Sequence, residues 1–355
     1  PNISFYVYPQ IFLQRMVTDP ESEGPGDPDN YGIRTKLDAV LSPSTVLRAR
    51  SALNTFDPDK FEDNLRASIR LQQAIPTPIG THKLAFEYSY RDRLFNGSLG
   101  FQTVRSSLGA LFFSPNIVIG KTGLVLNYQL GYQDIRSETD RLDLLEPGQT
   151  DNLVNLGRFQ SSVFLGRSFL LWQGKPLPAT RDEGLNYTPR PIIPYISMNA
   201  GLRGVFSSYT SGDTQQDLIG TVGLNAQLGH FSRPFLDYTA IGLSYSQVIG
   251  SGESPFFFDR TVDNQVLSLS FFQQIYGPLR FGIQTSLNVE TGDSISTDYF
   301  LEYSRRTHGI IFRYNPVLAI GSISLRISDF NWQGTADPFD GAGVSPVVGG
   351  VKRRF

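Results

Sequence analysis

The stretch that decides the fold is LRFGIQTSLNVE, residues 279–290. Its odd-numbered positions are apolar apart from one threonine and comprise Leu279, Phe281, Ile283, Thr285, Leu287 and Val289. Its even-numbered positions are polar, charged or glycine. Because successive side chains of a β-strand point to opposite faces, this alternation predicts a strand with one apolar and one polar face. The stretch is longer than most strands of soluble proteins and matches the ~9–11 tilted residues that cross a bilayer.

The same alternation recurs along the chain, for instance at 65–72 and 83–93. Short turns such as 306–308 alternate with longer polar loops such as 136–151, which is typical of outer-membrane barrels. We therefore expect an all-β fold, a transmembrane antiparallel β-barrel of about 14–18 strands that forms a single domain over residues 1–355. A soluble β-sandwich or β-solenoid is the alternative, but sandwich strands usually have about 5–6 residues.

The composition limits the classes of function. The chain has 355 residues, no cysteine and a net charge of −2, with a mean hydropathy of −0.18. Such a hydropathy is compatible with a lipid-facing barrel, since alternating residues cancel in the average. The nearly neutral charge argues against nucleic acid as a partner, and the lack of cysteine excludes disulfides and thiolate metal sites. The opening PNISFYVYPQ has no leader-like pattern, so we expect a mature chain or part of a longer one.

Residues suited to catalysis or metal binding are sparse. The three histidines, His82, His230 and His308, lie in or beside predicted short turns on one side of the barrel. No serine occupies a nucleophile elbow, and no phosphate-binding glycine loop or metal motif occurs. We therefore expect no enzyme, no cofactor and no metal. The acidic loop 18–30 has carboxylates that suit a divalent cation, although a solvated run of charges is the more common arrangement.

Arginines on the polar faces of the predicted strands carry a stronger signal. By parity these lumen-facing residues are Arg34, Arg48, Arg50, Arg66, Arg70, Arg91, Arg93, Arg105 and Arg280. Guanidinium groups bind phosphate and carboxylate in a forked geometry, so the lumen would handle anionic headgroups or select anions. The alternative is a cross-strand ladder in which these arginines pair with lumenal Asp38, Glu87 and Glu290. The sequence favours neither over the other.

The connection 168–190 is too long for a barrel turn and contains Leu170, Leu171 and Trp172. Counting strands places it on the side of the short turns. We expect it to pack on the rim of the barrel or to contact a partner domain, whereas a flexible insertion is the alternative.

The block DYFLEYSRRTHGIIFRYNPVLAIGSISLRISDFNWQG, residues 298–334, resembles the end of the barrel in the cyanobacterial family related to LptD, the lipopolysaccharide-assembly protein. The resemblance implies a place in the cell outer membrane, in contact with membrane lipids. It also implies a translocon that inserts lipopolysaccharide or a related glycolipid into the outer leaflet through a seam between the first and last strands. The implied partners are a plug lipoprotein and a periplasmic jellyroll domain, which we do not find in residues 1–355. A passive diffusion porin is the alternative function.

The predicted seam carries residues that weaken strand pairing. Pro9 lies within the first extended segment, and a proline, which has no N–H, belongs at a sheet edge or a bulge. Gly349 and Gly350 sit beside Val351 in the predicted last strand, and glycine contributes little to a strand. We therefore expect a lateral gate at Pro9, Gly349 and Gly350, with few backbone hydrogen bonds between 3–15 and 345–355. The alternative is that Pro9 ends a short segment before the barrel or faces a bulge.

Overall fold

The computed structural model describes most of the chain, namely residues 2–11, 31–317, 320–327, 344–348 and 350–352. These residues are mainly β-strand, with three short 3-10 turns and one short helix, α1 (Phe61–Asn64). No helix in the described residues is long and apolar enough to cross a membrane.

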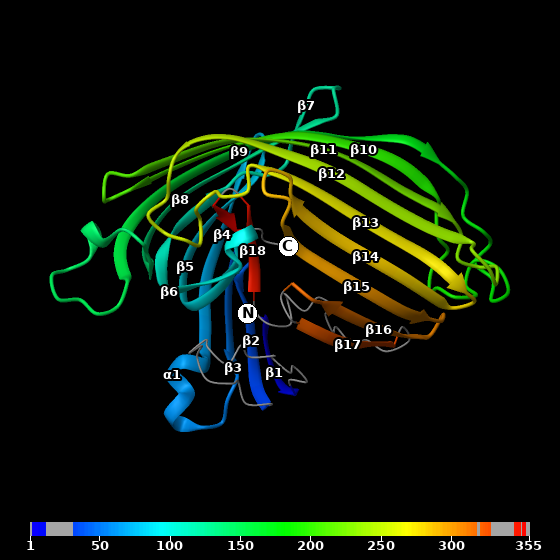
Figure 1. The fold of residues 1–355 in the computed structure, drawn as a ribbon, viewed down its shortest axis with the longest axis horizontal. Coiled ribbons are helices and arrows are strands. Elements are labelled where there is room, and N and C mark those ends of the chain that lie inside the picture. Colours follow the sequence, from blue (N-terminus) through cyan, green and yellow to red (C-terminus); the bar gives the residue numbers. More distant parts are fainter. Residues whose placement is uncertain (1, 12–30, 318–319, 328–343, 349, 353–355) are drawn as a thin grey trace.

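The strands of the described residues form one sheet of 19 strands. The strands of the wall and its one short arm, β7, are β1 (Asn2–Ile11), β2 (Tyr31–Ser42), β3 (Thr45–Leu53), β4 (Leu65–Thr77), β5 (Gly80–Phe95), β6 (Phe101–Phe113), β7 (Ile117–Ile119), β8 (Leu124–Glu138), β9 (Leu153–Gln173), β10 (Tyr195–Tyr209), β11 (Thr214–Gly229), β12 (Tyr238–Gly252), β13 (Gln265–Tyr276), β14 (Leu279–Asn288), β15 (Ser294–Ser304), β16 (His308–Asn315) and β17 (Ile320–Ile327). Two further strands, β18 (Val344–Val348) and β19 (Val351–Lys352), lie inside this wall (Figure 1).

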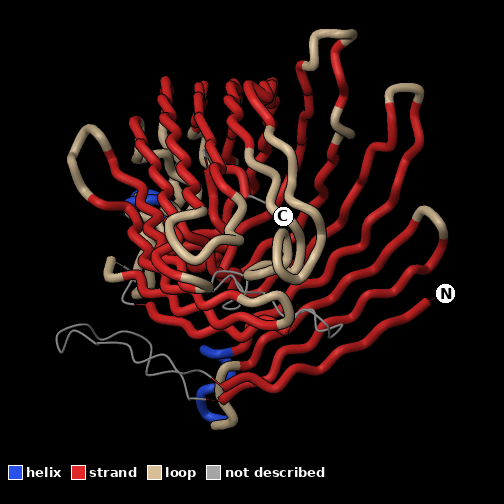
Figure 2. Tube along the Cα trace, turned by 90° about the vertical axis from the view of Figure 1, so that its right-hand side faces the viewer, coloured by secondary structure: helices blue, strands red, loops and turns tan. Residues whose placement is uncertain are grey.

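From β1 to β17 the wall follows chain order with antiparallel pairing, except that β6 pairs with β8 and the short β7 pairs with β8 alone. The sheet curls into a barrel-like shell (Figure 1). Within the described residues no ladder joins β1 to β17, so the shell is open along that side (Figure 2). The predicted all-β antiparallel fold is confirmed. The strand number exceeds the expected range because β7, β18 and β19 are short pieces that the sequence pattern did not reveal.

The stretch that opened the sequence argument forms β14, and its two faces differ as predicted. On the polar face Arg280 Nη2 lies 2.5 Å from Glu302 Oε2 of β15, and Asn288 Nδ2 donates to Asp263 Oδ1 at 2.8 Å. On the other face Phe281 is exposed at the outside of the shell. The strand ends at Asn288, so Val289 falls just beyond it.

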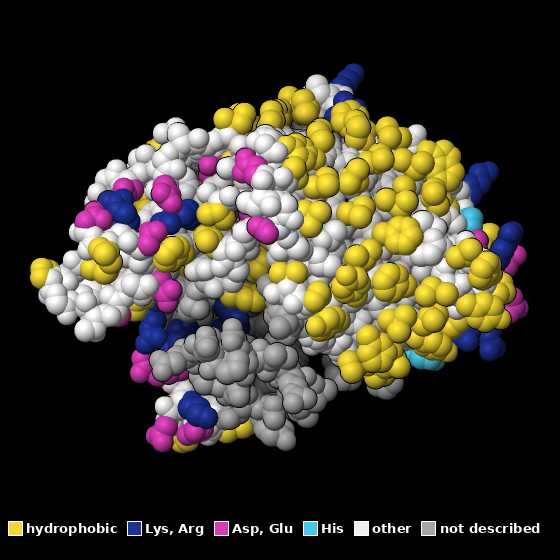
Figure 3. All heavy atoms as spheres, in the orientation of Figure 1, with side chains coloured by type: hydrophobic (Ala, Val, Ile, Leu, Met, Phe, Trp, Pro, Cys, Tyr) yellow, Lys and Arg dark blue, Asp and Glu magenta, His cyan; other side chains and the backbone are white. Residues whose placement is uncertain are grey.

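Exposed apolar side chains cover the outside of the shell. Among them are Leu202, Leu218, Val222, Leu224, Ile241, Leu243, Ile249, Leu301, Phe312, Ile323 and Leu325. Figure 3 shows these hydrophobic side chains spread over the region of β10 to β15, while Lys, Arg, Asp and Glu gather at the two ends of the shell. A soluble monomer rarely exposes an apolar surface of this extent.

Connections of two kinds separate the two ends of the shell. The long loops 54–64, 139–152 and 253–264 lie at one end, and the turns 43–44, 78–79 and 277–278 lie at the other. All three histidines lie at the end of the short turns, as predicted. We call these the long-loop end and the short-turn end.

Candidate functional site: a filled lumen beside an open edge

The loop 253–264 between β12 and β13 folds into the lumen. Phe256 has no exposed surface and Phe258 is 4% exposed. They pack against inward-facing side chains of the wall and of β18, comprising Leu94, Val104, Ile135, Val154, Leu156, Tyr209 and Val347. Burying two aromatic rings removes a large apolar area from water, which stabilises the inward conformation.

The backbone of the inward loop has side-chain partners just beyond the ends of β5 and β8. Asn96 Nδ2 donates to the carbonyls of Phe257 at 2.8 Å and Arg260 at 2.9 Å, and Thr139 Oγ1 donates to the Pro255 carbonyl at 2.6 Å. A buried backbone carbonyl without a partner would cost free energy comparable to a lost hydrogen bond. These contacts therefore allow a non-strand segment to lie inside the barrel.

Asp259 lies at the centre of the inward loop and has no exposed surface. Arg158 Nη1 of β9 lies 2.6 Å from its Oδ2, and the Tyr209 hydroxyl of β10 donates to the same oxygen at 2.9 Å. The Ser254 hydroxyl donates to the other carboxylate oxygen. A buried carboxylate is tolerated only when it is paired and hydrogen-bonded, and these three partners satisfy it. Ser254 belongs to the loop itself, so Arg158 and Tyr209 are the two that hold the loop against the wall.

The described residues of the segment 344–352, which are 344–348 and 350–352, also lie in the lumen, and β18 lies beside β5. Pairing of β5 with β4 ends at Tyr90, where Arg91 has a φ of +52°, an unusual value that redirects the strand. The edge of β5 left without β4 is taken by β18, which runs parallel to it from Val344↔Arg93 to Pro346↔Phe95.

Gly350 joins this segment to the inward loop. Its carbonyl accepts a hydrogen bond from Gln160 Nε2 at 3.0 Å. It has a φ of +71°, and a Cβ there would come within 3.1 Å of the Asp259 carbonyl oxygen. Glycine therefore suits both the backbone conformation and the close approach.

These positions correct the predicted seam. Gly350 does not lie in a strand next to β1, because 344–352 packs on the inward loop and β5, and Gly349 lies outside the described residues. β17 is the last described strand of the wall. Pro9 pairs with Ile33 of β2, in the strand that forms the open edge. No ladder joins the described parts of 3–15 and 345–355, as expected. The reason differs from the predicted one, because the described part of 345–355 lies inside the barrel and not in the wall next to β1.

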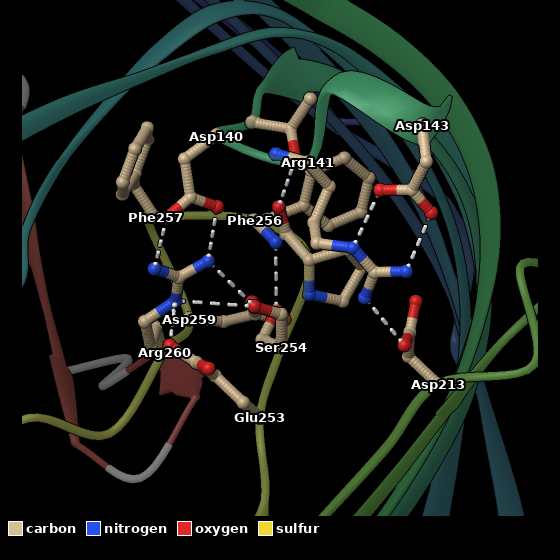
Figure 4. A network of polar contacts seen from close by, with 12 residues as sticks. Asp140, Arg141, Asp143, Asp213, Glu253, Ser254, Phe256, Phe257, Asp259 and Arg260 are labelled. Atoms are coloured by element: carbon tan, nitrogen blue, oxygen red, sulfur yellow. Dashed lines mark hydrogen bonds and ion pairs between the residues drawn. The ribbon is translucent and has the colours of Figure 1, made fainter. Parts of the chain in front are cut away.

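Ion pairs surround the inward loop where it meets the long-loop end (Figure 4). Arg260 forms a bidentate pair with Asp140 at 2.7 and 2.8 Å, and its Nε lies 2.9 Å from Glu253 Oε1. Arg141 bridges Asp143 at 2.7 Å and Asp213 at 2.8 Å. The side-chain hydrogen bonds from Arg260 hold the pKa of Asp140 below its ordinary value of 3.8.

We expect the inward loop to loosen in acid. Because the pKa of Asp140 is lowered in the folded state, its pairing with Arg260 stabilises the loop at neutral pH and is lost as the pH falls through that lowered pKa. R260Q lacks the pair at every pH, so its loop is already without this stabilisation at a pH where the pair still holds the wild-type loop. Pepsin, which acts in acid, should cleave at Phe256–Phe258 in R260Q at a pH where the wild type resists. R305Q, at the short-turn end, serves as control, and identical cleavage profiles would refute the role of the pair.

The connection at the short-turn end packs as predicted but is shorter than expected. Residues 168–173 belong to β9, which leaves 174–194 as the connection. Tyr187 is buried with Phe231 and Tyr238, and its carbonyl accepts a hydrogen bond from Ser304 Oγ at 2.9 Å. The connection therefore packs on the rim of the barrel, whereas Leu170 to Trp172 are exposed strand residues.

The predicted arginines lie on strands β2 to β6 and on β14. Several are in ion pairs: Arg91 with Asp63 at 2.8 Å, Arg105 with Glu62 at 2.6 Å, Arg70 with Glu87 at 3.7 Å, Arg48 with Asp38 at 3.5 Å and Arg280 with Glu302 at 2.5 Å. The ladder interpretation thus holds in part, with Glu302 in place of the expected Glu290. The other arginines lie on four neighbouring strands of the wall: Arg34 on β2, Arg50 on β3, Arg66 on β4 and Arg93 on β5. The acidic loop 18–30 lies outside the described residues, so its cation site stays a prediction.

The sequence argument missed the inward loop, its buried Asp259 and the wall residue Arg158 that pairs with it. A signal was present, because the polar loop before β13 contains the run Phe256, Phe257 and Phe258. Three consecutive aromatic residues in a loop would be costly to expose, which indicates that the loop is buried.

Comparison with known proteins gives a family but no activity. Residues 1–331 match the family described as "Protein of unknown function (DUF3769)". The chain belongs to this family. No curated protein and no solved structure matches the chain. Because the family description assigns no function, the geometry of the open edge and the filled lumen carries the functional argument.

Proposed function

We propose that this member of the DUF3769 family is an outer-membrane translocon of the LptD type. It passes lipopolysaccharide or a related glycolipid into the outer leaflet through the side of the barrel, between β1 and β17. A plug lipoprotein and a periplasmic jellyroll domain are its proposed partners. The proposal concerns a transport protein without bond-making chemistry, so binding and a lateral opening do the work.

The open edge is the observation that supports this proposal most directly. Neighbouring strands of the described wall are joined by ladders from β1 to β17, whereas β1 and β17 are not joined to each other. An open edge is usually a liability in a β-sheet, because its unpaired backbone groups invite aggregation. In lipid each such group is costly as well. An opening retained at this cost agrees with a passage that cargo uses.

The filled lumen supports a sideways path over a vertical one. The inward loop 253–264 and the segment 344–352 occupy the lumen, and a cavity bounded by Glu87, Arg158, Phe258 and Lys352 has a volume of only about 50 Å³. A glycolipid entering the barrel therefore meets packed side chains toward the long loops. The apolar outer surface is consistent with lipid on the outside of the same wall.

The test is a covalent closure of the opening. The chain has no cysteine, so S4C on β1 and S324C on β17 provide a unique pair for a bifunctional maleimide. We expect the crosslinked barrel to remain folded and to stop delivering glycolipid to the cell surface, measured by surface labelling in cells that depend on this protein.

The matched control crosslinks two strands that are already paired. Thr35 and Ser51 face each other in the β2–β3 ladder with their hydroxyl oxygens 2.7 Å apart. A crosslink in T35C/S51C should leave delivery unchanged, because it adds no constraint on the opening. Normal delivery by the crosslinked S4C/S324C protein would refute the lateral path.

A diffusion porin is the second candidate, and the inward loop favours it. Many porins narrow their lumen with a loop folded inward, and 253–264 occupies such a position. Planar bilayers distinguish the two functions. A steady conductance through the wild-type protein would favour the porin. A lumen that conducts only after the inward loop is released would favour the translocon.

A further inference from the structure

The lumen-facing side of β1 to β5 carries three cross-strand rows that the ladders define. The rows are Arg34, Ala52 and Arg66; Tyr6, Lys36, Arg50, Ser68 and Ser89; and Ser4, Asp38, Arg48, Arg70 and Glu87. Residues directly opposite each other in an antiparallel ladder share one face of the sheet. Glu87 and Ser89 line the lumenal cavity beside Phe258, so all three rows face the lumen.

This surface is strongly basic. The rows contain six cationic side chains, Arg34, Lys36, Arg48, Arg50, Arg66 and Arg70, against the two carboxylates of Asp38 and Glu87. Arg66 also lies among Arg34, Arg91 and Arg93. We call the six cationic residues of the rows the basic wall.

The ladder places like charges directly opposite each other in the basic wall. Lys36 faces Arg50, and Arg48 faces Arg70. Such pairs destabilise a sheet, because cross-strand neighbours lie only about 5 Å apart. Arg48 and Arg50 are also exposed to the lumen. Asp38 offsets part of this repulsion, because it lies 2.6 Å from Lys36 and 3.5 Å from Arg48. Glu87 lies 3.7 Å from Arg70. Two carboxylates do not balance six cations, so a bound anion would relieve the remainder, and guanidinium groups suit the oxygens of a phosphate.

The basic wall lies beside the open edge of the barrel. Only β1 separates β2 from the opening, and its lumen-facing residues Ser4 and Tyr6 continue two of the rows. The opposite side of β1 presents Ile3, Phe5 and Val7, each more than half exposed. A molecule at this edge would therefore meet an apolar surface outside the barrel and a basic surface inside it.

We propose that the basic wall binds the phosphorylated headgroup of an anionic lipid whose acyl chains remain outside β1. This inference rests on the proposed function and names the chemistry of its cargo: an amphiphile with a phosphate-bearing headgroup. The headgroup oxygens contact the guanidinium groups of Arg48 and Arg50, and the lumen provides the water that a polar headgroup requires.

The experiment compares two lipids with identical acyl chains, phosphatidic acid and phosphatidylcholine, titrated onto the full chain in neutral detergent and followed by native mass spectrometry. We expect the phosphatidic acid to bind about tenfold more tightly, as one or two charge-assisted hydrogen bonds would provide. R48Q/R50Q should lose that preference and leave phosphatidylcholine binding unchanged. The change removes two like-charge contacts across the ladders and gives up one exposed pair, Arg48 with Asp38 at 3.5 Å. Exposed pairs contribute little to stability, so the variant should fold like the wild type.

The control variant K121Q/R136Q removes two cations away from the basic wall. Lys121 is exposed in the turn before β8, and Arg136 pairs near the long-loop end with Asp151 at 3.7 Å. Its lipid preference should equal that of the wild type, and an equal loss there would reduce the effect to net charge and overturn the site. Inorganic pyrophosphate that binds as tightly as phosphatidic acid would assign the wall to free phosphate and overturn the lipid assignment.

The outcomes separate this inference from the proposed function. Absence of a lipid preference, together with delivery that stops on crosslinking S4C/S324C, overturns the basic wall alone. A lipid preference lost in R48Q/R50Q, together with normal delivery by the crosslinked protein, supports the wall as a lipid site and overturns the lateral path.

Discussion

Replacing Asp259 with alanine is expected to release the inward loop, so that the lumen of the barrel conducts ions where the wild-type lumen does not. The variant leaves Arg158, which is only 7% exposed, buried without its carboxylate, and it removes the acceptor of the Tyr209 hydroxyl. Breaking a buried ion pair by removing one partner costs about 3–5 kcal/mol. The contacts of Arg158 and Tyr209 with the loop both depend on this carboxylate, so the loop rather than the wall should give way.

Single-channel recording in planar bilayers measures this effect as a rise in conductance. The matched control is D151A, whose carboxylate pairs with Arg136 at 3.7 Å and is 48% exposed. Exposed pairs contribute about 0–1 kcal/mol, so the control should show the same low conductance as the wild type. The double variant R158M/D259M removes both charges, which is often neutral in a buried site, and should conduct less than D259A. Equal conductance of D259A and wild type would show that the ion pair does not hold the loop.

Replacing Ile283 with arginine is expected to block stable insertion of the barrel into lipid. Ile283 lies in the middle of β14 on the outer face, opposite Phe271 of β13 and Tyr299 of β15. An arginine near the midplane of the bilayer costs about 2–4 kcal/mol on a lipid-facing strand. The neighbouring Q284R places the same charge on the lumen side and should insert normally.

Folding into lipid vesicles, followed by the shift in gel mobility between heated and unheated samples, measures insertion. Cysteine labelling provides a second measurement that does not depend on stability. I283C should resist a water-soluble maleimide in intact membranes, while Q284C, at an exposed lumenal position, should react. Equal insertion of the two arginine variants, or the reverse labelling pattern, would refute a lipid-facing outer surface.

The alternation of polar and apolar residues determined the main part of the fold. In β14 it placed Arg280 and Asn288 on the lumen side and Phe281 outside, and both assignments agree with the contacts of these side chains. A period of two suffices for this because every side chain of a strand faces one of only two sides. The same parity placed Arg34, Arg48, Arg50, Arg66 and Arg70 on one face before any ladder was known.

Tertiary structure alone decided how the lumen is filled and where the barrel is open. No local pattern indicates that Asp259 meets Arg158, which is 101 residues away in the chain, because such a contact depends on how the whole sheet curls. The sequence likewise predicted 345–355 as the closing strand, yet the described part of this segment pairs with the end of β5. That edge exists only because Arg91 turns β5 away from β4. Strand character is local, whereas the choice of a pairing partner depends on which edges the assembled sheet leaves free.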